Sequence, residues 1–122
     1  MQDRENQLME LLVNLADSEP KITACAVLSS DAFPLASWCG RHEDEKDLSR
    51  FFSEVIAAAE RAGEYFKIGA ADRIYLKAKN GYLVVFQVNE NAHLACALEA
   101  GARMDDALKT IKGCASKLAE VI

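Results

Sequence analysis

The stretch RIYLKAKNGYLVVFQVNENAHLACAL (residues 73–98) decides the fold of this chain. Asn80-Gly81 separates two runs of strand-forming residues, and Asn and Gly tolerate best the positive φ angles that the two central residues of a type I′ turn need. A two-residue turn fixes the register of the hairpin that it closes. The pairs that this turn predicts are Lys79 with Tyr82, Lys77 with Val84 and Tyr75 with Phe86.

The strand after this turn, residues 82–88, is apolar on both faces apart from Gln87. Such a strand is typical of a sheet that is covered on both sides. A second turn at residues 89–91 leads into a third apolar run at residues 93–98. We therefore predict an antiparallel meander, with Lys77 and Lys79 on its first strand as on an edge strand that resists unwanted pairing.

The remaining elements follow from periodicity and from breaking residues. Apolar residues at helical spacing predict helices over residues 2–16, 44–68 and 101–122, and apolar runs predict strands over residues 22–30 and 33–38. Pro34 makes the second of these an edge strand, because proline cannot donate to a ladder. Asp44 is the predicted N-cap of the middle helix and Gly69 its C′ residue. Ala32 stands in the tight turn between the first two strands.

The order helix, strand, strand, helix, three strands, helix predicts an α/β (α+β) fold. Five antiparallel strands with helices on both faces form a three-layer α/β/α sandwich. A chain of 122 residues is a single domain, residues 1–122.

Charge and composition exclude several classes of partner. A net charge of −5 argues against a nucleic-acid groove and against an anionic membrane surface. No apolar run approaches the roughly 18 residues that a membrane span needs, and the first residues lack the features of a secretory signal. The four cysteines are therefore expected to be reduced thiols of a cytoplasmic protein.

The element order and three segments resemble the Roadblock / dynein light-chain family. The segments are AVLSSDAFPLASW (26–38), NGYLVVFQV (80–88) and HLACALEAGARMDDAL (93–108). Ala32 stands where that family usually has Gly, so either the turn type differs or strain is stored there. The resemblance covers about residues 8–118.

This resemblance implies a non-catalytic dimer in which the middle helix and the neighbouring edge strand pair across a two-fold axis. The dimer would be a homodimer or include a paralogous Roadblock-like subunit, and it would serve as a platform for a small Ras-like GTPase, as in the MglB-type regulators, or as a scaffold of motors and signalling. The interface residues that follow are Leu48, Arg50, Phe51, Phe52, Val55, Ala58, Ala59, Arg61, Ala62, Tyr65, Phe66, Tyr75, Lys77 and Lys79.

The apolar residues of the middle helix also fit a second interpretation. Positions 48, 51, 52, 55, 56 and 59 already make a full core stripe, so the same residues can all face their own sheet. Trp38, at a strand end, is equally compatible with a core role and with a partner contact.

Catalytic and metal sites find little support in the pattern. Cys39 and His42 could be half of a zinc site completed by His93, Cys96 or Cys114, but zinc sites usually show paired ligands at C-x₂₋₄-C spacing and none is present. A lone His93 lacks an identifiable nucleophile and orienting group. We predict no catalytic residue, no metal and no cofactor. The alternatives to a GTPase-binding module are a sensor for a small ligand and a scaffold subunit without GTPase regulation.

Overall fold

The computed structural model describes residues 3–40 and 45–122. Its elements are α1 (Arg4–Ser18), β1 (Ile22–Ser29), β2 (Pro34–Cys39), α2 (Glu45–Tyr65), β3 (Arg73–Ala78), β4 (Gly81–Asn89), β5 (Ala92–Glu99) and α3 (Met104–Val121). Every predicted element is present in the predicted order, with bounds that differ by a few residues. The predicted N-cap Asp44 lies outside the described residues.

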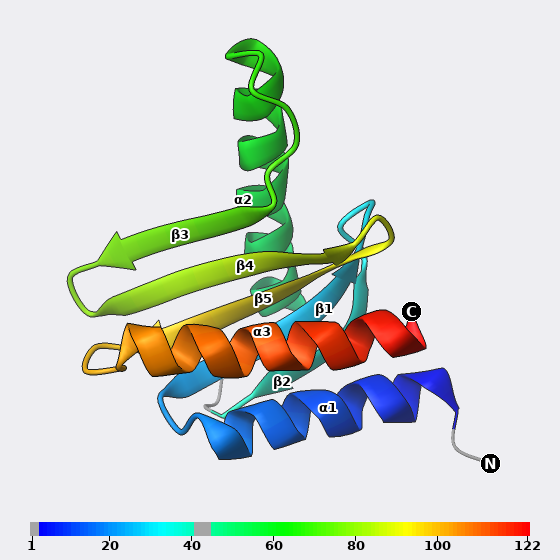
Figure 1. The fold of residues 1–122 in the computed structure, drawn as a ribbon, viewed down its shortest axis with the longest axis vertical. Coiled ribbons are helices and arrows are strands. Elements are labelled where there is room, and N and C mark those ends of the chain that lie inside the picture. The colour runs from blue at the N-terminus through cyan, green and yellow to red at the C-terminus, as the bar shows by residue number, and fades with distance from the viewer. Residues whose placement is uncertain (1–2, 41–44) are drawn as a thin grey trace.

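The five strands form one antiparallel sheet in the order β2-β1-β5-β4-β3. Helices α1 and α3 lie side by side on one face, and α2 is the one helix of residues 3–40 and 45–122 that crosses the other face (Figure 1). This confirms the predicted three-layer sandwich and both predicted edge strands, β2 and β3. The central strand is β5.

Two apolar clusters fill the spaces above and below the sheet, because alternate residues of a strand point to opposite faces. Phe86 and Val84 of β4 belong to the cluster under α1 and α3, and Val85 belongs to the cluster under α2. All three are buried, so β4 is covered on both faces as its sequence indicates. In β5 the residues from Ala92 to Cys96 are buried without interruption.

The hairpin between β3 and β4 differs from the prediction. The observed pairs are Ala78 with Gly81, Lys77 with Tyr82, Tyr75 with Val84 and Arg73 with Phe86. The register is therefore displaced by two residues, which leaves each side chain on its predicted face, and Lys79 lies in the turn rather than in the strand. Neither Asn80 nor Gly81 has a positive φ, so the turn is not of type I′. Gly81 is required for another reason, because a Cβ there would collide with the carbonyl oxygen of Leu98 on β5.

The end of α2 also differs from the prediction, because Lys67 and not Gly69 is the C′ residue. Lys67 has a φ of +57°, its N–H donates to the carbonyl of Glu64 at 3.2 Å, and the N–H of Ile68 donates to the carbonyl of Gly63 at 3.0 Å. This pair of bonds is a Schellman motif. Gly63 has no space for a Cβ, because the carbonyl oxygen of Gly69 packs directly against it.

The turn between β1 and β2 holds Ala32 at a φ of +67°, a conformation that is uncommon for a residue other than glycine. Its N–H donates to the carbonyl of Ser29 at 2.8 Å. Its carbonyl accepts a bond of 2.6 Å from the hydroxyl of Ser53 on α2. The turn is thus attached to the helix that crosses the sheet.

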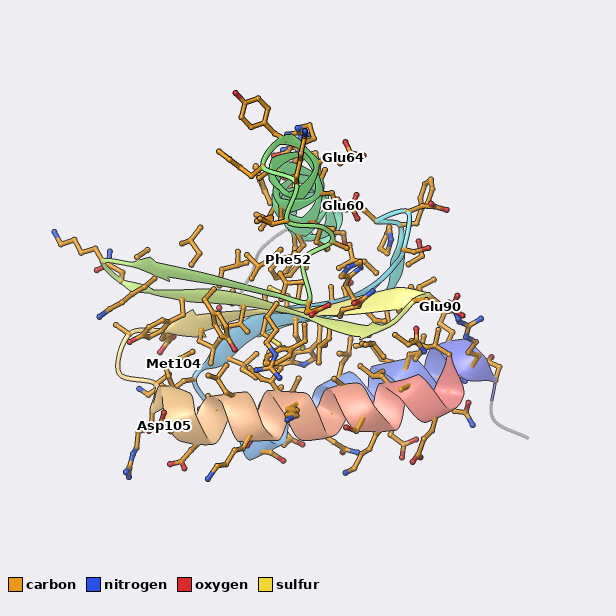
Figure 2. All side chains as sticks on the ribbon, turned by 45° about the horizontal axis from the view of Figure 1, so that its top comes forward. Phe52, Glu60, Glu64, Glu90, Met104 and Asp105 are labelled. Atoms are coloured by element: carbon orange, nitrogen blue, oxygen red, sulfur yellow. The ribbon has the colours of Figure 1, made fainter. Side chains whose placement is uncertain are left out.

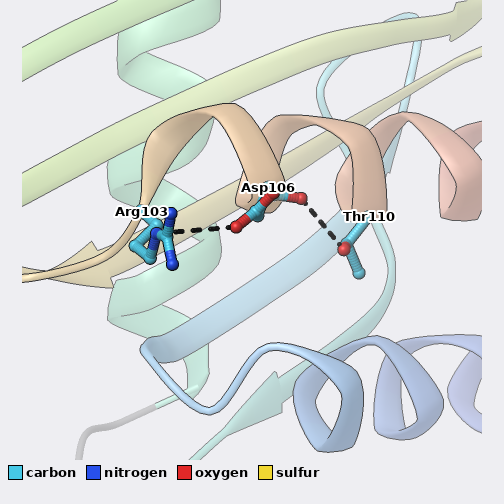
Figure 3. Close-up of polar contacts among 3 residues, drawn as sticks. All are labelled: Arg103, Asp106 and Thr110. Carbon is cyan, nitrogen blue, oxygen red and sulfur yellow. Dashed lines mark hydrogen bonds and ion pairs between the residues drawn. The ribbon is translucent and has the colours of Figure 1, made fainter.

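Arg103 is the N-cap residue of α3 and makes no side-chain capping bond, and Figure 3 shows it beside Asp106 of the first turn. Asp105 and Asp106 stand in its first turn, where the helix dipole favours negative charge. Arg103 Nε lies 3.6 Å from Asp106 Oδ2, and both side chains are largely exposed, so the ion pair adds little stability. The hydroxyl of Thr110 donates to the carbonyl of Asp106 at 3.1 Å.

We expect the substitution Phe86→Ala to lower the free energy of unfolding by about 3–5 kcal/mol, as truncation of a buried aromatic side chain does. Phe86 is 5 % exposed, and the Tyr75 ring and the Arg73 guanidinium pack against it. Urea unfolding measures the loss. The matched control is Phe33→Ala, which removes a ring that is 67 % exposed. Equal effects of the two substitutions would contradict the burial of Phe86.

Candidate interaction surface

The outer edge of β3 is the first part of the surface. This strand pairs with β4 on one side only, and five of its six residues are exposed. Tyr75 is 52 % exposed on one face of the sheet and Leu76 is 46 % exposed on the other. An edge strand with bare backbone groups and exposed apolar side chains is a template for pairing with another chain.

The opposite edge strand, β2, is less accessible than β3. Both α1 and α2 pack against β2, and Pro34 at its start removes one backbone donor. Trp38 on this strand is half-buried and packs against the core cluster under α1 and α3. The structure therefore leaves β3 as the more accessible edge.

Helix α2 carries two apolar stripes. Leu48, Phe52 and Ile56 are buried against the chain's own sheet, and Figure 2 shows Phe52 between α2 and the sheet, with Glu64 towards the far end of the helix. The second stripe, which we call the exposed seam, consists of Phe51, Val55, Ala58, Ala62 and Tyr65. Phe51 is 53 % exposed, Val55 is half-buried, and the other three are exposed.

Sequence reasoning thus grouped residues that the structure separates. Leu48 and Phe52 belong to the core of the chain, and Ala59 is half-buried. Arg61 and Ala62 are exposed on the helix, and Tyr75 and Lys77 are exposed on β3. Arg50 is engaged locally, because its Nη2 lies 3.4 Å from Asp47 Oδ1 and its guanidinium carbon lies 4.8 Å from the centroid of the Phe51 ring.

The end of α2, which we call the tip, consists of Tyr65, Phe66 and Ile68. These side chains are 79 %, 67 % and 78 % exposed. The two rings pack edge to face with centroids 4.9 Å apart. Figure 1 shows this end of α2 extending beyond β3, where no strand lies beneath it. Ile68 was not among the predicted interface residues, although an apolar residue at the C″ position was a usable signal.

Two cavities border the surface. An apolar hollow of about 360 Å³ lies beside the first turns of α2 and is lined by Ala24, Asp47, Leu48, Phe51, Phe52, Leu83 and Ala97. We call it the hollow. A more polar groove of about 730 Å³ lies on the other face between α3 and the strands β3 and β4, and Arg73, Phe86, Lys112 and Ser116 are among its lining residues. Neither cavity is lined by His93 or Cys96.

The cysteines of the core are poor nucleophiles and poor ligands. Burial raises the pKa of Cys25 to about 12 and that of Cys114 to about 11, and it raises the pKa of Cys96 well above its usual range. Within residues 3–40 and 45–122, no three His, Cys, Asp or Glu side chains are grouped so that they could hold a metal ion. His42, half of the zinc site considered above, lies outside these ranges.

His93 is buried on the α2 face of the sheet. Its Nδ1 has no hydrogen-bond partner among the described residues. Burial lowers the pKa of His93, and the Glu60 carboxylate and a hydrogen bond with the Ser29 backbone oppose that effect. The net effect of this environment is to favour the neutral imidazole.

The fold and the exposed surface define a three-layer α+β domain with an unpaired edge strand beside a partly uncovered helix. Residues 8–98 match the family model of the Roadblock/LC7 domain, and the chain belongs to that family. No curated protein matches the sequence. None of the helices in the described part of the chain is long and apolar enough to cross a membrane.

Solved structures of similar fold include three that align over nearly the whole chain. MglB of Myxococcus xanthus has a TM-score of 0.84 at 10 % identity and covers 99 % of this chain and 91 % of its own. An MglB with a tetrameric arrangement has a TM-score of 0.82 at 14 % identity, with the same coverage. A Roadblock/LC7 domain from Streptomyces avermitilis has a TM-score of 0.77 at 16 % identity and covers 92 % and 94 %. At these identities the likeness concerns the fold.

We expect the stability of the protein to decrease as the pH falls below 6.5, the ordinary pKa of histidine, and His93 to account for part of this loss. Because the pKa of His93 is lower in the folded chain than in the unfolded chain, the unfolded chain binds more protons in this range, so the free energy of unfolding rises with pH. Urea unfolding between pH 5 and pH 8 measures the pH dependence of the free energy of unfolding, for the wild type and for His93→Gln. An unchanged slope in the variant would contradict the burial of a neutral His93.

Proposed function

We propose that the chain is a non-catalytic interaction module that forms a two-fold symmetric dimer through β3 and α2. The observation that carries this proposal is the exposure of the β3 edge together with the exposed seam of α2, a helix that crosses the same sheet and extends beyond β3 (Figure 1). Exposed apolar patches of several hundred Å² mark interaction sites. Either a second copy of this chain or a paralogous Roadblock-like subunit has the complementary surface.

The geometry of such a dimer follows from the symmetry. A two-fold axis perpendicular to the sheet makes two β3 strands antiparallel neighbours and joins the two sheets into one. The same operation places the two α2 helices antiparallel on one face. The apolar seams then turn towards each other, and the charged side chains Glu54, Arg61 and Glu64 remain on the outside of the helix pair.

We further propose that this helix pair docks a small Ras-like GTPase. Support comes from the family resemblance and from the likeness of the fold to MglB. A partner without two-fold symmetry lies across the axis and contacts the two copies differently. Neither Arg50 nor Arg61 is identifiable as a catalytic arginine, so the dimer regulates the GTPase by ordering its loops or scaffolds it, rather than by donating a catalytic group. A cytoplasmic location is part of this proposal.

The dimer is tested by light scattering at micromolar concentration. We expect a mass of twice the chain mass of 13.4 kDa. Leu76→Lys places a charge on the β3 edge and should shift the mass towards that of one chain. A wild-type mass of one chain over a wide range of concentration would refute the dimer.

Binding of a GTPase by the dimer is tested by pull-down against the Ras-like GTPases of the same genome, each loaded with GDP or with a GTP analogue. We expect Arg61→Glu to weaken capture at least about tenfold, as removal of a hot-spot arginine does. Arg50→Glu should also weaken capture, although it alters the local contacts with Asp47 and Phe51 as well. The matched control is Lys117→Glu, an exposed charge reversal on α3.

The outcomes separate the candidate functions. Equal capture by the Arg61 variant and the wild type would remove the outer side of α2 from the contact. If the wild-type dimer captures none of the GTPases, the scaffold without GTPase regulation replaces the GTPase platform, and the dimer stands on its own measurement.

A further inference from the structure

The tip of α2 is an apolar cluster that none of the described residues covers. The Schellman bonds of Lys67 and Ile68 close the helix end, and Gly69 N–H adds a bond of 3.3 Å to the carbonyl of Gly63. The contact between Gly63 and the Gly69 carbonyl fixes the returning chain against the helix. Tyr65, Phe66 and Ile68 are therefore presented to solvent by a closed backbone structure, and their joint exposure calls for a partner surface.

The exposed seam leads directly to this tip. Its members, Phe51, Val55, Ala58, Ala62 and Tyr65, alternate at intervals of four and three residues, which is the spacing of a helix that packs along a second helix. Small alanines occupy the middle of the seam and the large rings occupy its ends. Since the distance between packed helices depends on the side chains at the contact, two such helices can approach closely at their centres. In an antiparallel pair, the tip of one helix then lies beside the first turns of the other helix.

The hollow at the other end of α2 is an apolar cavity that is open at the same seam. Phe51 is the first member of the seam and also lines the hollow. Leu83 and Ala97 form its floor on β4 and β5, and both are half-buried in the single chain. An open apolar cavity of about 360 Å³ can accept large side chains from another molecule.

The reach of α2 matches the distance between two hollows. From Leu48 at the hollow to Tyr65 at the tip, the helix extends roughly 26 Å at about 1.5 Å per residue. The lining residues Ala24, Ala97 and Leu83 lie on β1, β5 and β4, so the hollow is centred on β5. The line along which two β3 strands would pair is then about two and a half strand spacings away, or roughly 12 Å. A two-fold axis on that line separates the two hollows by roughly 24 Å. A helix that begins at one hollow is thus long enough to end at the other.

We propose that the tip of each copy fills the hollow of the other copy. The occupant of the hollow is a second copy of this chain, and the hollow is incomplete without it. This inference rests on the dimer proposed above and adds the residues that close it: Tyr65 and Phe66 of one copy against Phe51, Leu83 and Ala97 of the other. Because the contact occurs twice, the two ends of the helix pair are fastened while the alanines pack at its centre.

The first test compares Phe66→Ser with Phe33→Ser. Both rings are 67 % exposed in the single chain, but Phe66 belongs to the tip, whereas Phe33 lies in the turn between β1 and β2 and is outside both the tip and the seam. We expect Phe66→Ser to raise the dissociation constant of the dimer at least about thirtyfold, as loss of a hot-spot aromatic does. Phe33→Ser should leave it unchanged. Sedimentation measures the dissociation constants, and circular dichroism shows that both variants are folded.

The second test cross-links position 66 at the tip of one copy to position 83 in the hollow of the other copy. One chain carries Phe66→Cys, the other carries Leu83→Cys, and both carry Cys39→Ser. A short bismaleimide should link the two chains only when they are mixed. The buried Cys25, Cys96 and Cys114 contribute little background, because burial keeps them as thiols. Phe33→Cys mixed with Leu83→Cys is the matched control and should give no cross-link.

The outcomes distinguish this inference from the proposed function. A wild-type chain that stays monomeric would overturn the dimer and the tip contact together. A dimer that Phe66→Ser leaves unchanged, or that gives no cross-link between positions 66 and 83, would overturn the tip contact alone. Binding of an apolar fluorescent dye at the hollow of the intact dimer would also overturn it, and would favour a small-ligand site there.

Discussion

Helix α2 has to carry the chain from one edge of the sheet to the other, because β2 and β3 are the two edge strands. The edges of a five-stranded sheet are about four strand spacings, or roughly 19 Å, apart. The 21 residues of α2 extend about 31 Å. The helix is therefore longer than the sheet is wide, and its last turns have no strand to pack against (Figure 1). This mismatch of lengths is the source of the exposed tip.

The crossing of the sheet by α2 also leaves the two faces of the sheet unequally covered. Helices α1 and α3 cover one face, whereas in the described part of the chain α2 is the one helix on the other face (Figure 1). One helix covers only a band of a five-stranded sheet, and Leu76 and the hollow lie beside that band. An apolar face with too few helices of its own is completed by another molecule more readily than by water.

The glycines show where local reasoning was insufficient. Near the β3–β4 turn, Asn80-Gly81 has the composition of a type I′ turn, yet Gly81 has an ordinary φ and makes room for the Leu98 carbonyl of a neighbouring strand. At the end of α2, Gly69 was expected at C′, yet Lys67 adopts the left-handed conformation and Gly63 makes room for the returning chain. A glycine that permits a close approach has the same appearance in a sequence as a glycine that permits a positive φ.

The sequence by itself determined the kind and order of the elements and which strands lie at the edges. These depend on local periodicity, on Pro34 and on the lysines of β3, and they are encoded within a few neighbouring residues. Only the tertiary structure decided which apolar residues of α2 are core. Phe51 and Phe52 are adjacent and identical in type, yet one is 53 % exposed and the other 3 %. Their difference depends on the direction in which α2 crosses strands that are distant in sequence, and hydrophobicity alone carries no information on that direction.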